Sequence, residues 1–451
     1  MPGPQPAIKY SSLALGVSAA LGAIGLGGAA LGQEATAPAA APALSADGVY
    51  ILNTLLFLVM GFLVMWMAAG FAMLEAGMVR SRNVAMQCIK NISLYSVAGL
   101  MFWAIGYNLM YAGVDGGYFG SFLPKIIPDP SQDAGDYAAG SDWFFQMVFA
   151  AATASIVSGT VAERIKLWPF LIFTALLTGL IYPVVGAWKW GEGWLHVAGF
   201  NDFAGSTLVH STGGWAALTG AIILGARTGK YGKGGSVNPM PGSSMPLATL
   251  GTFILWLGWF GFNGGSQLAL GTIEDASSIS RIFVNTNLAA AGGVIAAMIL
   301  TQLTYGKVDL TMALNGALAG LVSITAEPLM PTPLWAIFIG AVGGVIVIVV
   351  VPMLDKLKID DVVGAIPVHL GAGIWGTLAV VLTNPEATIG AQLLGIGAIG
   401  AFVVVASSIV WLVLKATIGI RVSAEDEMIG LDKAELGMEA YPEFGQGAGR
   451  L

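Results

Sequence analysis

The sequence is poor in charged residues and cysteine, and each shortage excludes a class of protein. Charged residues make up 10% of the 451 residues, against about 25% in a soluble domain. Cys88 is the single cysteine, which excludes a disulfide framework and a CxxC metal site. The formal net charge of -7 gives no support to nucleic-acid binding. What is present instead is a hydrophobic content of 56%, the composition of a membrane protein.

Long apolar runs recur from residue 50 to residue 415, each close to the roughly 20 residues that cross a bilayer. We therefore predict an all-α polytopic membrane protein with eleven transmembrane helices. The expected segments are 50–75, 88–113, 142–162, 168–187, 206–225, 247–267, 282–303, 309–326, 333–352, 363–382 and 391–415.

The first residues have the pattern of a secretory signal peptide. In residues 1–37, Lys9 precedes an Ala, Gly and Leu run, and small residues follow around Ala35 and Ala37, where cleavage is expected. Residues 38–49 then form a spacer on the outer side. A twelfth helix is the alternative, but the high glycine content and short span favour the signal peptide.

The basic residues orient the chain. Fifteen of the 19 Lys and Arg residues fall in loops that this topology makes cytoplasmic, while Lys125, Lys189 and Arg281 fall in outer loops. This bias follows the positive-inside rule. We therefore expect a multi-pass protein of the cell (inner) membrane, with the amino terminus outside and the carboxyl terminus in the cytoplasm. The outer loop 114–141 carries four aspartates, which concentrate cations nearby.

A short repeat links the fifth and the tenth expected helix. The stretches "DFAGSTLVH" at 202–210 and "DVVGAIPVH" at 361–369 share Asp, then Gly three residues later, then Val-His at the end. Because five is an odd number, two five-helix halves enter the membrane in opposite directions, which is the inverted-repeat plan of many transporters. We therefore predict two inverted five-helix repeats and an eleventh helix.

Two histidines occupy equivalent positions in this repeat. His210 and His369 each lie eight residues after an aspartate, so at about 1.5 Å per residue each imidazole lies about 12 Å inside its helix. Both approach the bilayer centre from opposite faces. A lone histidine on an apolar helix is usually a packing residue, but a repeated pair indicates a pathway. For Asp202 and Asp361 we expect helix capping, with a part for Asp202 in the outer site as the alternative.

The surroundings of the pair indicate what passes. Imidazoles and hydrocarbon do not replace the hydration shell of a permanent metal cation. Glu75 is the nearest carboxylate, and we expect it to be exposed at the inner end of its helix. Aromatic clusters at 144–149, 188–194 and 258–266 surround the outer half, where ring faces attract a cation by roughly 0.5–2 kcal/mol. An ammonium-type ion can release its proton on desolvation, and imidazole can carry that proton.

Five motifs carry a resemblance to a known family. They are "DFAGSTLVHSTGG" from residue 202, "GWFGFNGGS" from residue 258, "VAERIK" at 161–166, "VHLGAGIWG" at 368–376 and "GLDKAELGMEAYPEF" at 430–444. With these motifs the chain resembles the ammonium transporter family (Amt/Mep/Rh) over residues 50–445. The resemblance implies a homotrimer in which each subunit has its own pore, and Trp190 with Ser266 favours the Amt branch.

The resemblance also implies roles for nine residues along this pore. The outer ammonium-binding site is expected at Phe149, Trp190, Trp259 and Ser266. The gate below it is expected at Phe149 and Phe262, and the proton relay at His210 and His369. Asp202 and Phe145 are expected to support the outer site. No metal, cofactor or catalytic residue is expected, because no Ser/Lys, paired Asp or metal-ligand arrangement falls at mid-membrane depth.

The prediction is therefore an ammonium transporter that recruits ammonium at the outer aromatic site, deprotonates it and passes ammonia through a hydrophobic pore, with the paired histidines relaying the proton. The alternative is an ammonium sensor that signals through its cytoplasmic tail. Besides ammonium, methylammonium and the other two subunits, the resemblance implies a PII-type signalling protein at the cytoplasmic face. The tail departs from the family at Glu435-Leu436-Gly437, where Glu-His-Gly is frequent, and residues 423–451 contain no threonine to serve as a phosphorylation switch.

The predicted organisation has seven parts. They are a signal peptide (1–37), an outer spacer (38–49), transmembrane repeat 1 (50–225), a cytoplasmic loop (226–246), transmembrane repeat 2 (247–382), helix eleven (391–415) and a cytoplasmic regulatory tail (416–451).

Overall fold

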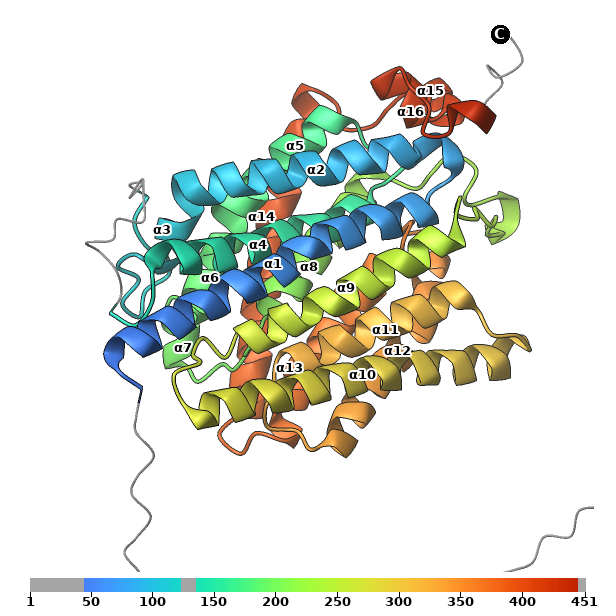
Figure 1. Ribbon diagram of the computed structural model, residues 1–451. Coiled ribbons are helices and arrows are strands. Elements are labelled where there is room, and N and C mark those ends of the chain that lie inside the picture. Colours follow the sequence, from blue (N-terminus) through green and yellow to red (C-terminus); the bar gives the residue numbers. More distant parts are fainter. Residues whose placement is uncertain (1–43, 123–134, 445–451) are drawn as a thin grey trace, which may run out of the picture. The chain divides into compact units, whose positions relative to one another are not determined.

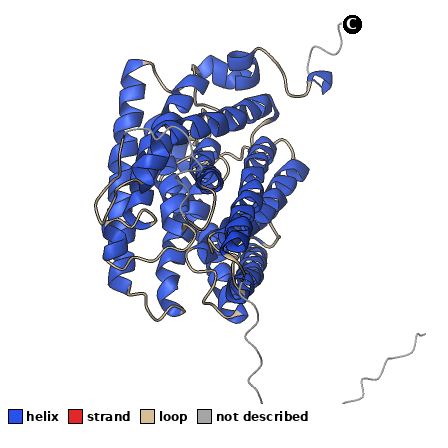
Figure 2. Cartoon of the chain, turned by 60° about the vertical axis from the view of Figure 1, so that its left-hand side comes forward, coloured by secondary structure: helices blue, strands red, loops and turns tan. Residues whose placement is uncertain are grey.

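The apolar runs of the sequence become long helices that lie side by side (Figure 1). The computed structural model describes residues 44–122 and 135–444, so the predicted signal peptide and its cleavage site lie outside the described residues. Within those residues all regular structure is helical, with isolated bridges and no β-strand (Figure 2). The predicted all-α class is confirmed.

Eleven apolar helical segments occur in the described residues. Nine are long and apolar enough to cross a membrane, and two shorter ones cover Leu310–Thr325 and Ile366–Leu382. The eleven-span topology itself stays a prediction. The continuous helices are α1 (Ala46–Met78), α4 (Ala139–Thr160), α9 (Met245–Gly265), α10 (Ile273–Tyr305), α11 (Leu310–Thr325), α12 (Pro333–Lys356) and α14 (Ile389–Thr417).

Each of the remaining four segments contains a π-helical turn. The pairs are α2 (Val84–Met101) and α3 (Tyr107–Tyr111) around Phe102–Gly106, and α5 (Leu167–Leu176) and α6 (Tyr182–Lys189) around Leu177–Ile181. The π-helical turns Ser206–Ser211 and Ile366–Gly371 precede α8 (Thr212–Leu224) and α13 (Ala372–Ala379). Such turns are rare and are frequent at functional sites.

Capping residues decide where several helices begin. The expected segment 282–303 is wrong at its start, because α10 begins nine residues earlier, at Ile273. There Thr272 and Asp275 form a capping box, in which each side chain accepts a hydrogen bond from the other residue's backbone N–H. A capping box satisfies two N–H groups that a helix start otherwise leaves unpaired. The polar turn that follows Thr272 is therefore part of the helix rather than a loop before it.

Small residues let the helices approach closely. Helices α1 and α9 lie side by side (Figure 1). A Cβ at Gly70 of α1 would lie 3.0 Å from the Gly251 carbonyl oxygen of α9, so a larger residue would force the two backbones apart. Close backbone approach at glycine is a common way of packing helices within a membrane.

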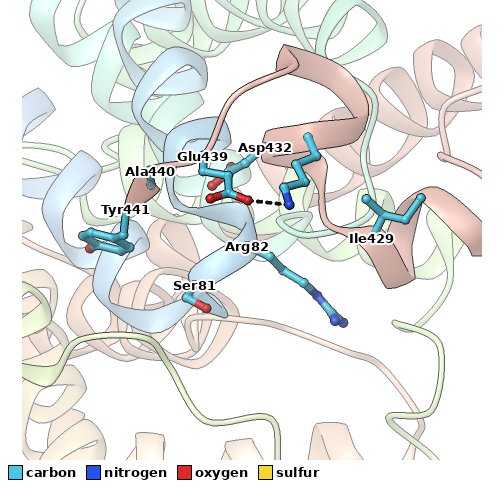
Figure 3. A pocket seen from close by; sticks show the side chains of 8 residues that line it. Ser81, Arg82, Ile429, Asp432, Glu439, Ala440 and Tyr441 are labelled. Carbon is cyan, nitrogen blue, oxygen red and sulfur yellow. Dashed lines mark ion pairs between the residues drawn. The ribbon is translucent and has the colours of Figure 1, made fainter. Parts of the chain in front are cut away.

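The tail folds back onto the same chain. It forms α15 (Ala424–Ile429) and α16 (Leu431–Leu436), and α16 lies beside the first turns of α2 (Figure 1). The Asp432 carboxylate accepts hydrogen bonds from the N–H groups of Ala85 and Met86, at 3.0 and 2.7 Å. Between the tail and the α1–α2 connection lies a cavity of about 250 Å³ (Figure 3). Its lining includes Arg82 and the Lys433–Glu439 ion pair.

Candidate transport pathway

A cavity of about 450 Å³ opens at one end of the helices, and we call it the Trp190 cavity. Its lining comes from α3, the α3–α4 connection, α4, the α6–α8 connection and the end of α9. The lining residues are Tyr107, Tyr111, Val114, Asp115, Tyr137, Asp142, Phe145, Gln146, Phe149, Trp190, Gly191, Glu192, Phe203, Ser266 and Leu268. This set is rich in aromatic rings, and its charged members, Asp115, Asp142 and Glu192, are all acidic.

Phenylalanine rings line this cavity and continue beyond it. The rings of Phe149 and Phe262 stack with centroids 4.1 Å apart, and Phe145 lies one turn along α4, 4.8 Å from Phe149. Trp190 meets Phe149 edge-on at 6.0 Å. The Ser266 hydroxyl donates to the Phe262 carbonyl at 2.8 Å, so its oxygen lone pairs remain available to a donor in the cavity. These five predicted residues are therefore brought together at one place.

The two predicted histidines meet next to the second ring of that stack. His210 stacks on Phe262 with centroids 5.1 Å apart, and its Nδ1 lies 3.1 Å from Nδ1 of His369. Both side chains are buried. Because each neutral imidazole has one N–H and one lone pair, one Nδ1 donates and the other accepts. In the described residues His210 Nε2 has no hydrogen-bond partner.

The two segments that carry these histidines have the same local construction. Each histidine lies in a π-helical turn, eight residues after an aspartate that accepts backbone N–H bonds at the start of that turn. Gly205 and Gly364, each three residues after its aspartate, have positive φ angles of 109° and 78°. Side chains rarely tolerate such angles. The sequence repeat is therefore a repeat of backbone geometry.

Asp202 fixes the start of its turn through four backbone hydrogen bonds. One carboxylate oxygen accepts from Gly205 and Ser206 and the other from Thr207 and Leu208, at 2.8 to 3.0 Å. Its backbone carbonyl accepts the Trp190 indole N–H at 3.0 Å. Burial raises the pKa of Asp202 to about 6, against the lowering effect of the four N–H groups. Asp202 therefore has the predicted capping geometry and also holds Trp190 in place.

A second cavity, of about 610 Å³, reaches the other repeat, and we call it the Asp361 cavity. Its lining includes Asp361, Gly364 and Pro367 together with Arg227 and Lys230. A small cavity of about 10 Å³ shares Asn315 and Val363 with it and touches His369. The Trp190 cavity thus reaches the start of the 202–210 stretch, and the Asp361 cavity reaches the start of the 361–369 stretch. The histidine pair lies between the two cavities.

One predicted binding residue lies deeper than the others. Trp259 is fully buried, stacks on His210 with centroids 5.0 Å apart, and donates its indole N–H to the Thr325 hydroxyl at 2.8 Å. It does not line the Trp190 cavity. In this structure Trp259 supports the histidine pair, and its part in the outer site stays a prediction.

The exposed position expected for Glu75 is wrong. Its side chain is 1% exposed and lies 3.8 Å from the ammonium nitrogen of Lys90. The Ser158 hydroxyl donates to Glu75 at 2.7 Å, and Lys90 donates to the Ser158 carbonyl at 2.7 Å. A buried carboxylate is tolerated when a charge and hydrogen bonds satisfy it. The partners come from three different helices, so the sequence order does not show the pairing.

Asp142 was not among the predicted site residues. It lies in the first turn of α4, lines the Trp190 cavity and accepts hydrogen bonds from the Tyr107 hydroxyl at 2.6 Å and from Gln146 at 3.2 Å. Burial raises the pKa of nearby Tyr137 to about 12, and the negative charges of Asp142 and Asp136 add to this rise. The available signal was an acid two residues before the aromatic run at 144–149.

The "VAERIK" motif belongs to a charged cluster at the Asp361 end of the molecule. Arg227 pairs with Asp360 at 2.8 Å and with Glu163 at 3.3 Å. Arg164 donates to backbone carbonyls of both transmembrane repeats, including Gly225 of repeat 1 at 2.9 Å and Asp360 of repeat 2 at 2.6 Å. The motif therefore ties the two repeats together and takes no direct part in the pathway.

The sequence of this chain is similar to those of known proteins. The model of the Ammonium Transporter Family matches residues 55–441. The ammonium transporter Amt2 of Archaeoglobus fulgidus is 43% identical over 86% of this chain and 87% of its own length. Ammonium transporter 1 member 1 of Arabidopsis thaliana is 34% identical over 82% of each chain.

Solved structures agree with the sequence comparisons. The structure of a sensor Amt protein superposes with a TM-score of 0.81 at 36% identity, and it covers 85% of this chain and 98% of its own. The structure of Candida albicans Mep2 superposes with a TM-score of 0.75 at 27% identity, over 88% of this chain and 92% of its own.

Proposed function

This chain belongs to the ammonium transporter family, and we propose that it collects ammonium in the Trp190 cavity and passes ammonia towards the Asp361 cavity while His210 and His369 relay the proton. The observation that carries this proposal is the 3.1 Å contact between the two Nδ1 atoms. No chemistry other than proton transfer is needed, so the protein acts as a transporter rather than as an enzyme.

The Trp190 cavity supplies the binding step. Trp190 and Phe149 present ring faces and edges to a cation, and Ser266 keeps lone pairs free for an ammonium N–H group. The stacked pair Phe149 and Phe262 then closes the route to bulk water. Desolvation beyond this point favours the neutral amine over its cation, so the proton leaves before the ammonia passes on.

The histidine pair supplies the relay. When His210 accepts a proton at Nε2, its Nδ1 proton moves along the 3.1 Å hydrogen bond to Nδ1 of His369, and His369 releases its own proton from Nε2. One proton enters and one leaves, and both rings end neutral. A potassium ion has no proton to give, so the pathway excludes it.

Purified protein in liposomes tests this function. We expect an ammonium gradient to drive uptake and a steady current in the wild type, and potassium at the same concentration to drive neither. His210→Ala and His369→Ala should each abolish the current. Uptake with current in both variants would refute the relay.

The third histidine provides the matched control. His196 lies on the short helix α7 (Trp194–Val197), outside the pathway, with its Nδ1 3.3 Å from the Lys189 ammonium nitrogen. His196→Ala therefore removes the same side chain without touching the relay, and we expect it to keep wild-type current.

A sensor function is the second candidate, favoured by the tail and by one relative. The tail is tied to α2 through Asp432, and a solved structure of this fold is a sensor Amt protein. Deleting residues 424–451 leaves the backbone hydrogen bond from Lys166 to Ile420 intact. If the protein is a sensor, this deletion abolishes an ammonium response while flux persists. A plain transporter shows a change in flux alone.

We also propose the assembly and membrane that the resemblance implies. The protein forms a homotrimer in the cell membrane, with the Trp190 cavity outside, and its tail meets a PII-type protein in the cytoplasm. The exposed apolar faces of α10 and α12 are available to lipid or to neighbouring subunits. The mass of the detergent-solubilised particle, and labelling of cysteines introduced in 114–121 and in the tail from intact cells, test these points.

A further inference from the structure

Asp142 is a buried carboxylate that faces a cavity without a positive partner. The residue is 8% exposed, and its two hydrogen-bond donors, the Tyr107 hydroxyl and the Gln146 amide, are both neutral. The described residues place no Lys, Arg or His within ion-pair distance of it. A carboxylate offers about four lone-pair sites, so two of them remain for a further donor.

Four other buried acids of this chain are satisfied differently. Asp360 and Glu163 pair with arginines, Glu75 pairs with Lys90, and Asp202 accepts four backbone N–H groups. An isolated buried charge is costly unless a counter-charge or hydrogen bonds compensate it. Asp142 has the weaker set of donors and also lines a cavity of about 450 Å³, from which a mobile cation can supply the missing charge.

Three tyrosines complete the surroundings. Tyr107, Tyr111 and Tyr137 line the same cavity, and the rings of Tyr107 and Tyr111 lie 5.3 Å apart. The Tyr111 hydroxyl has no hydrogen-bond partner among the described residues, although its oxygen is buried. Ring faces attract a cation, and a phenol oxygen accepts an N–H group. The lining therefore offers acceptors of both kinds to a small cation that is itself a hydrogen-bond donor.

We propose that Asp142, with the ring of Tyr107 and the hydroxyl of Tyr111, forms a second binding site for a small ammonium-class cation, ahead of the site at Phe149, Trp190 and Ser266. This inference rests on the proposed function. Seven residues of α4 separate Asp142 from Phe149, a rise of about 10.5 Å. The two sites are thus successive stations along one wall of the Trp190 cavity. The site distinguishes ammonium and methylammonium from alkali cations, because only the first two have N–H groups that donate a hydrogen bond to Tyr111.

Charge removal at Asp142 tests the site. A unit charge about 10 Å from a cation, with an effective dielectric constant between that of a protein surface and that of water, changes the binding constant by about threefold to tenfold. We therefore expect Asp142→Asn to raise the apparent KM for methylammonium uptake into liposomes by this factor and to leave the maximal rate close to that of the wild type. An apparent KM within twofold of the wild type would overturn the inference.

Asp136→Asn is the matched control. Asp136 precedes α4, is exposed and does not line the cavity, so the same charge change there should leave the apparent KM within twofold of the wild type. An equal rise in both variants would show a general surface potential rather than a site, and would also overturn the inference.

Tyr107→Phe separates binding from a structural role for Asp142. This change removes the phenol donor that occupies Oδ2 of Asp142 and keeps both the carboxylate charge and the ring. If Asp142 binds the cation, we expect a lower apparent KM. If the Asp142 carboxylate were purely structural, Tyr107→Phe and Asp142→Asn would impair uptake alike. A rise in the apparent KM of Tyr107→Phe would therefore overturn the inference, even if Asp142→Asn fails to fold. If the wild type itself shows no uptake, the proposed function fails and this inference with it.

Discussion

Replacing Asp202 by asparagine changes one oxygen into an NH₂ group at the start of the His210 turn. In the wild type each carboxylate oxygen accepts two backbone N–H groups, those of Gly205 and Ser206 on one side and those of Thr207 and Leu208 on the other. Whichever way the amide turns, its NH₂ group therefore faces two N–H donors. No rotamer satisfies all four donors.

The cost follows from this geometry. Each buried N–H group left without an acceptor costs about 1–3 kcal/mol, so the two orphaned donors destabilise the protein by about 2–6 kcal/mol. The turn that Asp202 caps carries His210, and the backbone carbonyl of Asp202 holds Trp190. We therefore expect Asp202→Asn to lower both the unfolding midpoint and the rate of ammonium uptake.

The equivalent residue of the other repeat is the matched control. Asp361 accepts from the Ile366 N–H on one oxygen and from the Thr160 hydroxyl on the other. In Asp361→Asn the amide oxygen keeps the N–H group, and the NH₂ group donates to the hydroxyl, which can accept. The expected cost is about 1 kcal/mol or less.

Denaturant unfolding of the purified protein in detergent measures both variants. The expected result is a large loss for Asp202→Asn and a small one for Asp361→Asn. Equal losses, or an Asp202→Asn variant that unfolds within about 0.5 kcal/mol of the wild type, would refute the assignment of the four hydrogen bonds.

Three further predictions concern the charged groups away from the pathway. Burial acts to raise the pKa of Asp360, but hydrogen bonds from Arg227 and the charges of Arg164 and Arg227 outweigh it and hold the pKa well below its ordinary value. The stability that ionised Asp360 contributes is therefore complete above the unfolded pKa of about 3.9 and is lost as the pH falls below it. The unfolding midpoint of Asp360→Asn should depend less on pH below about pH 4 than that of the wild type. Glu75→Gln leaves Lys90 buried without its counter-charge and should cost about 3–5 kcal/mol, whereas adding Lys90→Met should recover most of this loss in the same unfolding assay, and a double variant no more stable than the single one would contradict the pairing. Asp432→Asn weakens the cap on Ala85 and Met86 at a cost of about 1 kcal/mol, so limited proteolysis should release the tail after residue 423 faster than in the wild type, and an unchanged rate would contradict the tail contact.

The candidate pathway was largely predictable because its residues belong to continuous motifs. His210 and His369 end two stretches with the same Asp, Gly and Val-His spacing, and this repeat, together with the helix count, indicated a symmetric pair. The stacked pair Phe149 and Phe262 rested on the family resemblance, and the structure places the two rings together. Asp142 was missed because an acid at a helix start is ordinarily a cap, and only the cavity shows that it faces neither a backbone donor cluster nor a basic residue.

The sequence by itself determined the all-helical class, because apolar runs of about 20 residues have few other ways to satisfy their backbone groups in lipid. It also determined the repeat and the equivalent positions of the two histidines within it, because a helix converts residue offsets into fixed distances. Only the tertiary structure decided which groups meet: that the histidines contact each other through Nδ1, that Glu75 is buried against Lys90, and that Trp259 stacks on His210. These contacts join helices far apart in the chain, and local patterns carry no information on which faces turn towards one another.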